Sequence, residues 1–165
     1  MIPELHRPLA ADAVSPAGEE VVVTASAAEC AALAVRMHLP AVRSLSCRFR
    51  LSPGPAAAIT AEGRLEAVVV QTCVRSVEDF PATVAERFVV RFVPAGTERD
   101  DADPDSIDEI PYAGGVLDLG EAAAEQLALA LDPYPRAPGA ALPDPEPTDA
   151  VATPFAALAE LRRRR

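Results

Sequence analysis

The sequence predicts an α+β fold in which an antiparallel β-sheet of about five strands packs with two α-helices. Several segments alternate apolar and polar residues with the period of a strand, and two others carry apolar residues at helical spacing behind a capping residue. Short links between successive strands favour an antiparallel meander. An open sheet and a partial barrel both fit this pattern. A proline-rich tail and a short C-terminal helix are expected after this core.

The first predicted unit is a strand followed by a helix. Residues 20–25 are typical of a short strand, and residues 2–9 are a second candidate. Ser26 and Glu29 have the spacing of a capping box, in which each side chain accepts a hydrogen bond from the other residue's amide. Pro40 limits the helix to about three turns. Its apolar face comprises Cys30, Leu33, Ala34 and Met37.

Residues 45–51 form the clearest predicted strand. Their apolar side chains point one way, while Arg48 and Arg50 point the other way. This alternation is typical of a sheet with one buried and one solvated face. Residues 52–55, with the sequence SPGP, predict a turn after this strand.

Two more strands are predicted at residues 59–72 and 84–93, because both segments alternate apolar and polar residues. Gly63 lies inside the first of them and indicates a bulge or bend. Residues 110–112 are a candidate to re-enter the sheet.

A second helix is predicted after Gly114 and Gly115, which form the turn that leads into it. Asp118 is its N-cap, and Pro133 stops it. Its apolar face comprises Leu119, Ala123, Leu127, Ala130 and Leu131. The expected core contains Leu33, Met37, Leu45, Phe49, Leu65, Val69, Phe88, Val90, Leu119, Leu127 and Leu131.

The chain is therefore divided into three parts. Residues 1–131 are a single α+β domain, and residues 132–152 are a proline-rich acidic linker. Residues 153–165 are a short amphipathic helical segment that ends in four arginines. This last segment is too short to be stable alone, which favours folding on a partner.

Composition limits the classes of function. The net charge of −10 argues against a protein that binds nucleic acid with its whole surface. Three widely spaced cysteines indicate neither a disulfide framework nor a zinc site. No segment has the pattern of a signal peptide or of a membrane span, so a cytoplasmic protein is expected.

Candidate catalytic groups are isolated from one another. Cys73 ends a predicted strand in the sequence Cys-x-x-Ser, without the paired ligands that zinc requires, so a structural role is expected. His6 and His38 have no nucleophile motif around them, and surface or capping roles are expected. Phosphate-binding glycine motifs are also lacking. The sequence therefore predicts a protein that is not an enzyme and has no catalytic residue, metal, cofactor or small-molecule substrate.

Two charged features and one apolar stripe are the candidate binding sites. Residues 98–109 carry seven acids, and this run is either a solvated loop or a surface for a basic partner. The four terminal arginines are either a solubilising tail or an anchor for phosphate. The candidate partner-binding residues are Asp100, Asp101, Asp103, Asp105, Asp108, Phe155, Leu158 and Leu161. The candidate nucleic-acid-binding residues are Arg162, Arg163, Arg164 and Arg165.

A series of short motifs, in order, resembles the YceD-like family of small bacterial and plastid proteins. The motifs are Gly63-Arg64-Leu65, Gln71-Thr72-Cys73-Val74, Asp118-Leu119, Glu125-Gln126-Leu127 with Leu129-Ala130-Leu131, Pro133-Tyr134-Pro135, and Pro154-Phe155-Ala156 with Leu158. Many members have a second cysteine where this chain has Ser76, and a further one where it has Arg136-Ala137. A metal or redox role of those cysteines could not operate here.

The resemblance implies a role in the accumulation or processing of 23S ribosomal RNA, and it supplies no catalytic residue that could be transferred to this chain. We therefore expect a non-enzymatic factor that binds a large-subunit ribosomal protein or 23S rRNA. Binding of a basic ribosomal protein by the acidic body is favoured over RNA binding by the arginine end, because the acidic loop carries more charges than the four arginines of the tail. The alternative is a general adaptor that docks residues 153–161 in a partner groove, unrelated to ribosomes.

Overall fold

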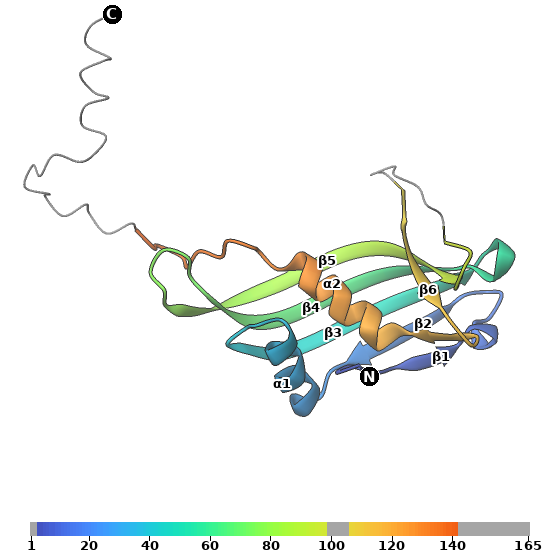
Figure 1. The fold of residues 1–165 in the computed structure, drawn as a ribbon, viewed down its shortest axis with the longest axis horizontal. Helices are drawn as coiled ribbons and strands as arrows, with labels where there is room; N and C mark the ends of the chain where they lie inside the picture. Colours follow the sequence, from blue (N-terminus) through green and yellow to red (C-terminus); the bar gives the residue numbers. More distant parts are fainter. Residues whose placement is uncertain (1–2, 99–105, 142–165) are drawn as a thin grey trace, which may run out of the picture.

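The protein folds as an elongated sheet with helices on one side (Figure 1). The structure is a computed structural model that describes residues 3–98 and 106–141. Five strands form the main sheet in the order β2-β3-β4-β5-β6, and β1 and β7 form a separate pair. The strands are β1 Pro8–Ala10, β2 Glu19–Thr24, β3 Ala41–Pro53, β4 Ile59–Thr72, β5 Asp79–Pro94, β6 Asp108–Tyr112 and β7 Val116–Asp118. The helices are α1 Ala27–Arg36 and α2 Leu119–Ala130.

The α+β prediction is confirmed, but the sheet is mixed and does not close into a barrel. Strands β2 to β5 pair antiparallel, as expected from their short links. Strand β6 pairs with β5 in parallel, from Val90 opposite Asp108 to Pro94 opposite Tyr112. The prediction of a wholly antiparallel sheet was wrong because a long connection, unlike a hairpin turn, can return the chain to the same end before the next strand. The expected N-terminal strand is β1, which pairs with β7 outside the main sheet.

Both helices begin at the residues that the sequence predicts. The Ser26 amide donates to Glu29 Oε2 at 2.7 Å and the Glu29 amide donates to Ser26 Oγ at 3.3 Å, which completes the capping box of α1. At the start of α2, Asp118 Oδ1 accepts hydrogen bonds from the amides of Gly120 and Glu121. These caps satisfy amides that would otherwise lack a partner in the first helical turn.

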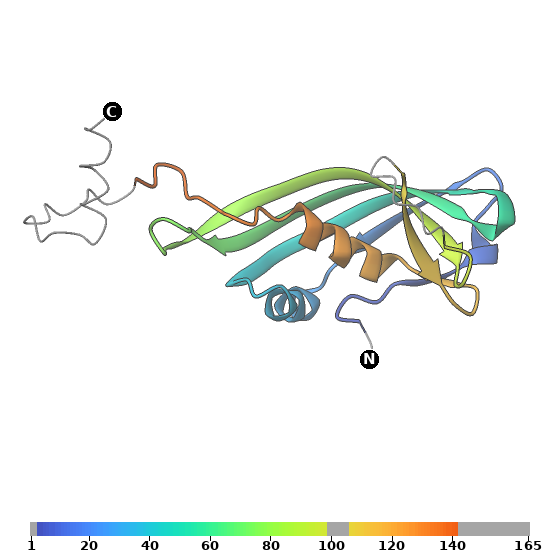
Figure 2. The same cartoon turned by 45° about the horizontal axis from the view of Figure 1, so that its top comes forward.

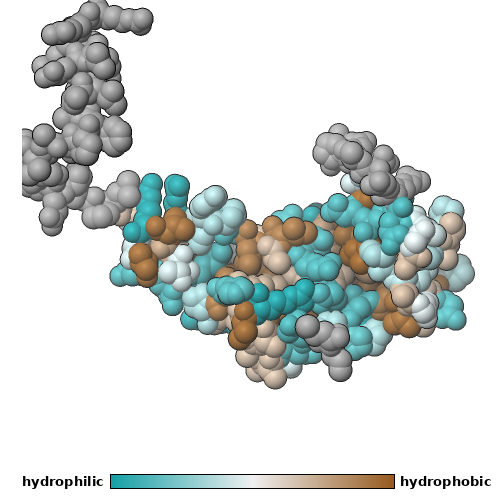
Figure 3. Space-filling model, in the orientation of Figure 1, coloured by the Kyte–Doolittle hydropathy of each residue, from teal (hydrophilic) through white to brown (hydrophobic). Residues whose placement is uncertain are grey.

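The described helices cover one face of the sheet and not the other. Helices α1 and α2 lie on the same side of it (Figure 2) and share one apolar core with the inward residues of β3 and β4. We call this side the inner face, and the opposite side the outer face. On the side of α2, apolar and polar surface alternate (Figure 3). Of the expected core, Leu33, Leu45, Phe49, Leu65, Val69, Val90, Leu119 and Leu127 are buried, and Met37, Phe88 and Leu131 are partly buried against them.

Gly63 gives room to an aromatic ring and does not form a bulge. Its strand pairs in regular register, with Phe49 on one side and Phe88 on the other. The two rings meet edge to face, with centroids 5.8 Å apart. A Cβ on Gly63 would lie 2.1 Å from Cζ of Phe88, so only glycine fits beneath this ring. The irregularity in the sheet lies between Val42 and Ser44 instead.

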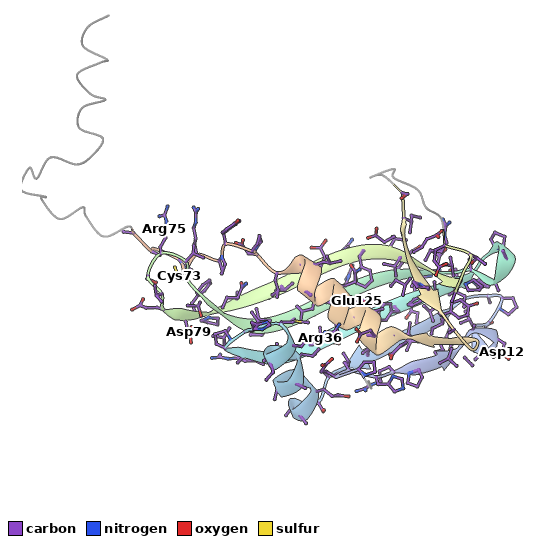
Figure 4. All side chains as sticks on the ribbon, viewed as in Figure 1. Asp12, Arg36, Cys73, Arg75, Asp79 and Glu125 are labelled. Atoms are coloured by element: carbon purple, nitrogen blue, oxygen red, sulfur yellow. The ribbon has the colours of Figure 1, made fainter. Side chains whose placement is uncertain are left out.

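Ion pairs fasten the N-terminal segment to α1, and α1 to α2. Arg7 forms a two-pronged pair with Glu29 of α1, with N–O distances of 2.7 and 2.9 Å. Arg36 of α1 bonds Glu121 of α2 in the same way, at 2.8 and 2.6 Å, and also contacts Glu4. Figure 4 shows Arg36 beside α2. The predicted surface or capping role of His6 fits its exposed position, where its Nδ1 lies 2.5 Å from Asp118 Oδ2.

The segment after α2 lies against the loop between β4 and β5. The amide of Val74 donates to the carbonyl of Pro135 at 2.9 Å, and Arg75 Nη1 donates to the carbonyl of Ala140 at 3.1 Å. Gln71 Nε2 donates to the carbonyl of Asp132 at 3.1 Å. Residues 132–141, the first part of the expected linker, are therefore in contact with the domain. Neither α1 nor α2 has the length and apolar character needed to cross a membrane.

Candidate nucleic-acid interface

Three arginines from adjacent strands form a row on the outer face. Arg64 of β4 lies directly opposite Arg48 of β3 and directly opposite Arg87 of β5. Directly opposed residues of an antiparallel pair place their side chains on the same face of the sheet. We call Arg48, Arg64 and Arg87 the arginine row, and all three are exposed.

Acidic residues frame this row without forming ion pairs with it. Arg50 lies two residues along β3, between Glu20 of β2 and Glu62 of β4. A shallow hollow of about 490 Å³ is lined by the arginine row, Arg50, Glu20 and Glu62, with Gly63, Phe88 and Val89. These side chains carry a local net charge of +2, in contrast to −10 for the whole chain. Among residues 3–98 and 106–141, no carboxylate forms an ion pair with Arg48, Arg50, Arg64 or Arg87.

The arrangement is costly for folding and suited to binding an anion. Like charges directly opposite each other in a sheet destabilise it. Within residues 3–98 and 106–141, no side chain pairs with the guanidinium groups of the row, which leaves their donors available to another molecule. A guanidinium group binds phosphate oxygens with two parallel hydrogen bonds. Rigid strands hold the row in place, so a phosphate chain could contact several arginines at once.

Strand register is the information that the sequence did not contain. The alternation of residues 45–51 and 59–72 assigns Arg48, Arg50 and Arg64 to solvated faces. It does not show that Arg48, Arg64 and Arg87 share one row, because that depends on how the two hairpins pair. The signal available in the sequence was an arginine at a polar position in each of three successive predicted strands.

Most of the candidate site residues lie outside the described residues. These are Asp100, Asp101, Asp103, Asp105, Phe155, Leu158, Leu161, Arg162, Arg163, Arg164 and Arg165. Asp108 is exposed at the start of β6, at one edge of the sheet. Its register partner is Val90, and the arginine row lies three residues earlier along β5. The structure therefore does not bring Asp108 into the row.

Cys73 is buried at the end of β4, in the loop at the end of the molecule opposite Asp12 (Figure 4). Hydrogen bonds from the Ser76 side chain and amide, and from the amides of Ala137 and Arg75, lower the pKa of its thiol to about 6. The sulfur lies 3.4 Å from the amide nitrogens of both Arg75 and Ser76. The sequence predicted its position at a strand end but not its acidity.

The other two cysteines are free and buried in the core. Burial raises the pKa of Cys47 to about 12 and raises that of Cys30 as well. Within the described part of the chain, no three His, Cys, Asp or Glu side chains are grouped so that they could hold a metal ion. His38 is exposed at the end of α1, as the sequence predicts.

Comparison with known families decides the relationship. The model of YceD, the large ribosomal RNA subunit accumulation protein, matches residues 61–162. The chain belongs to the YceD family. The resemblance seen in the sequence motifs is thereby confirmed. No curated protein and no solved structure matches the chain.

The YceD match begins within β4 and runs past the end of α2, and it includes two members of the arginine row, Arg64 and Arg87. Arg48 and Arg50 lie before it, on β3. The family name links the chain to the accumulation of large-subunit ribosomal RNA.

Proposed function

We propose that this YceD-family protein supports large-subunit rRNA accumulation by binding the rRNA backbone through the arginine row, without catalysing a reaction. The observation that carries the proposal is the direct opposition of Arg48, Arg64 and Arg87 on a face that no described helix covers. The family match supplies the biological context.

Charge distribution supports a contact confined to one face. A strongly acidic protein repels a polyanion over most of its surface, while a local positive patch attracts it. The attraction would act only when the outer face points at the RNA. Such a protein would bind weakly and in one orientation, without coating nucleic acid.

The proposal differs from the contacts that the sequence favoured. Binding of a basic ribosomal protein by residues 98–109 and adaptor binding by residues 153–161 both depend largely on residues outside the described part of the chain. The arginine row, by contrast, lies wholly within the described residues. We therefore place the RNA contact on the sheet.

A charge reversal in the middle of the row tests the proposal. In Arg64→Glu, the new carboxylate lies between Arg48 and Arg87 and can pair with both, so the fold is expected to persist. The matched control is Arg136→Glu, which makes the same change in charge beside the inner face of β5. Affinity of the full chain for transcribed 23S rRNA fragments is measured for both variants and the wild type.

We expect Arg64→Glu to weaken binding about tenfold or more, since it removes one phosphate contact and adds a repulsive charge. Arg136→Glu should bind within about twofold of the wild type, because Arg136 is not among the residues that line the hollow at the arginine row. Equal binding by all three proteins, or no binding by the wild type, would remove the proposal. A pull-down that recovers only one non-ribosomal protein would favour the adaptor instead.

A further inference from the structure

We infer that the RNA bound by the arginine row is a duplex, recognised through its phosphates without reading of its bases; this inference rests on the proposed function. The two ideas are separable, because an arginine face could equally bind an unpaired strand. Three features of the outer face favour the duplex.

The first feature is the chemistry of the side chains around the row. The outward residues of β2 to β5 near the row are Glu20, Val22, Thr24, Ser46, Arg48, Arg50, Glu62, Arg64, Glu66, Ala85, Arg87 and Val89. None of them is aromatic. Proteins that bind unpaired RNA stack its bases on aromatic side chains, whereas duplex RNA is contacted through phosphates and 2′-hydroxyls.

The aromatic residues of the sheet are on the other side. Phe49 and Phe92 are buried in the core, and the ring of Phe88 packs against Phe49. Phe80 lies opposite Gln71, which is buried and faces the segment after α2. Phe88 also contributes to the lining of the hollow, but its ring lies over Gly63 and against Phe49, on the inner side of the sheet. The outward side chains around the row therefore offer an unpaired base no aromatic ring to stack on.

The second feature is the rigidity of the row. Neighbouring strands of a sheet are about 4.8 Å apart, so the backbone positions of Arg48 and Arg87 are about 10 Å apart in a fixed line across the strands. A duplex also holds its phosphates in fixed positions. Because the strands fix the backbone positions of the arginines, a duplex with fixed phosphates loses less conformational entropy on binding than a disordered strand, which must be ordered first. On this face, base stacking is not available to offset the conformational entropy that a single strand would lose.

The third feature is access. Helices α1 and α2 both lie on the inner face (Figure 2), and the lining of the hollow comes from strands alone. No described helix stands over the row. A ligand as wide as a double helix can therefore approach it.

The test compares matched RNAs with the full chain. Fluorescence anisotropy is measured with an RNA duplex of about 20 base pairs, with each of its strands alone, chosen to be unstructured, and with the equivalent DNA duplex. Wild type, Arg64→Glu and the control Arg136→Glu are titrated at several salt concentrations. A second duplex of unrelated sequence tests whether bases are read.

We expect both RNA duplexes to bind equally, and about tenfold or more tighter than either single strand. Three phosphate contacts predict a slope of log affinity against log salt of about −3 for the duplex. Arg64→Glu should reduce the size of this slope by about one, and Arg136→Glu should leave it unchanged.

Other outcomes overturn the inference in distinguishable ways. If a single strand binds as tightly as the duplex and Arg64→Glu weakens that binding, the duplex inference is wrong and the proposed RNA contact stands. The duplex inference is equally wrong if one duplex sequence is strongly preferred, or if the DNA duplex binds tighter than the RNA. If no RNA binds, or if Arg64→Glu binds like the wild type, the proposed function is wrong as well.

Discussion

Arg48 and Arg64 are direct cross-strand partners on the solvated face of the sheet, although each would be more stable opposite a carboxylate. Two residues along β3, Arg50 has such neighbours, because Glu20 and Glu62 lie directly opposite it on the two adjacent strands. The same residue type on the same strand and face thus occurs in two opposite electrostatic settings. This contrast lets the cost of the arginine row be measured.

Replacing Arg48 with threonine should stabilise the fold, and the same change at Arg50 should destabilise it. The first removes a repulsion across the strands, and the second removes two attractions. We expect changes in the free energy of unfolding of about 0.2–1 kcal/mol in opposite directions, measured by urea denaturation at low salt. The difference should shrink at high salt. Changes of the same sign in both variants would show that the row carries no electrostatic cost.

Gly63→Ala should destabilise the protein because its Cβ would overlap the ring of Phe88. Overpacking of this kind costs about 1–3 kcal/mol. The matched control is the same substitution in a Phe88→Ala background, where the ring is absent and the added methyl group should cost little. Thermal unfolding of the wild type, the two single variants and the double variant gives the coupling energy between Gly63 and Phe88. An equal cost in both backgrounds would contradict the packing described here.

Glu29 should stabilise the folded state at neutral pH and lose this effect as the pH falls into the acid range. The side chain of Arg7 and the amide of Ser26 lower its pKa from 4.5 to about 2, so the folded state binds the proton less readily than the unfolded state. The stabilisation is complete above the unfolded pKa and is lost as the pH falls from about 4.5 to 2.

The variant Glu29→Gln tests this, since its amide oxygen can still accept from Ser26 while the charge pair with Arg7 is removed. At neutral pH, the free energy of unfolding of the wild type should be about 1 kcal/mol larger than that of the variant, allowing for partial solvent screening. The difference should vanish near the acid end of the range. A difference that does not change with pH would contradict the charge pair.

The Cys73 thiol should ionise near neutral pH, unlike the other two cysteines. Its pKa of about 6 lies below the ordinary value of 9.0, so its ionisation stabilises the fold increasingly as the pH rises from 6 to 9. Ultraviolet absorbance of the thiolate is measured against pH for the wild type and for Cys73→Ala, in which the transition should disappear. Ser76→Ala should raise the midpoint by removing the hydroxyl donor. A midpoint near 9 in the wild type would contradict this geometry.

Elements that depend only on neighbouring residues in the sequence were predicted well. The capping box at Ser26, the cap at Asp118 and the strand at residues 59–72 follow from neighbours in the sequence. Gly63 was misread because its glycine requirement comes from Phe88, a residue on another strand. The direction of β6 was misread because it depends on the path of a long connection.

The candidate site was less predictable than the fold. The acidic run and the terminal arginines could be predicted as candidate sites because each is a contiguous run of like charges in the sequence. The arginine row is dispersed over three strands and becomes a cluster only through pairing in register. The low pKa of Cys73 depends mainly on Ser76, three residues along the same loop, and in smaller part on Ala137, which is brought to the sulfur from beyond α2.

The most direct measurement is the level of large-subunit rRNA, relative to small-subunit rRNA, in cells whose own copy of this protein is replaced by Arg64→Glu or Arg136→Glu. Both variants must accumulate to the level of the wild type. The account predicts that large-subunit rRNA falls with Arg64→Glu and is maintained with Arg136→Glu. Normal large-subunit rRNA in cells that contain folded Arg64→Glu protein would contradict it.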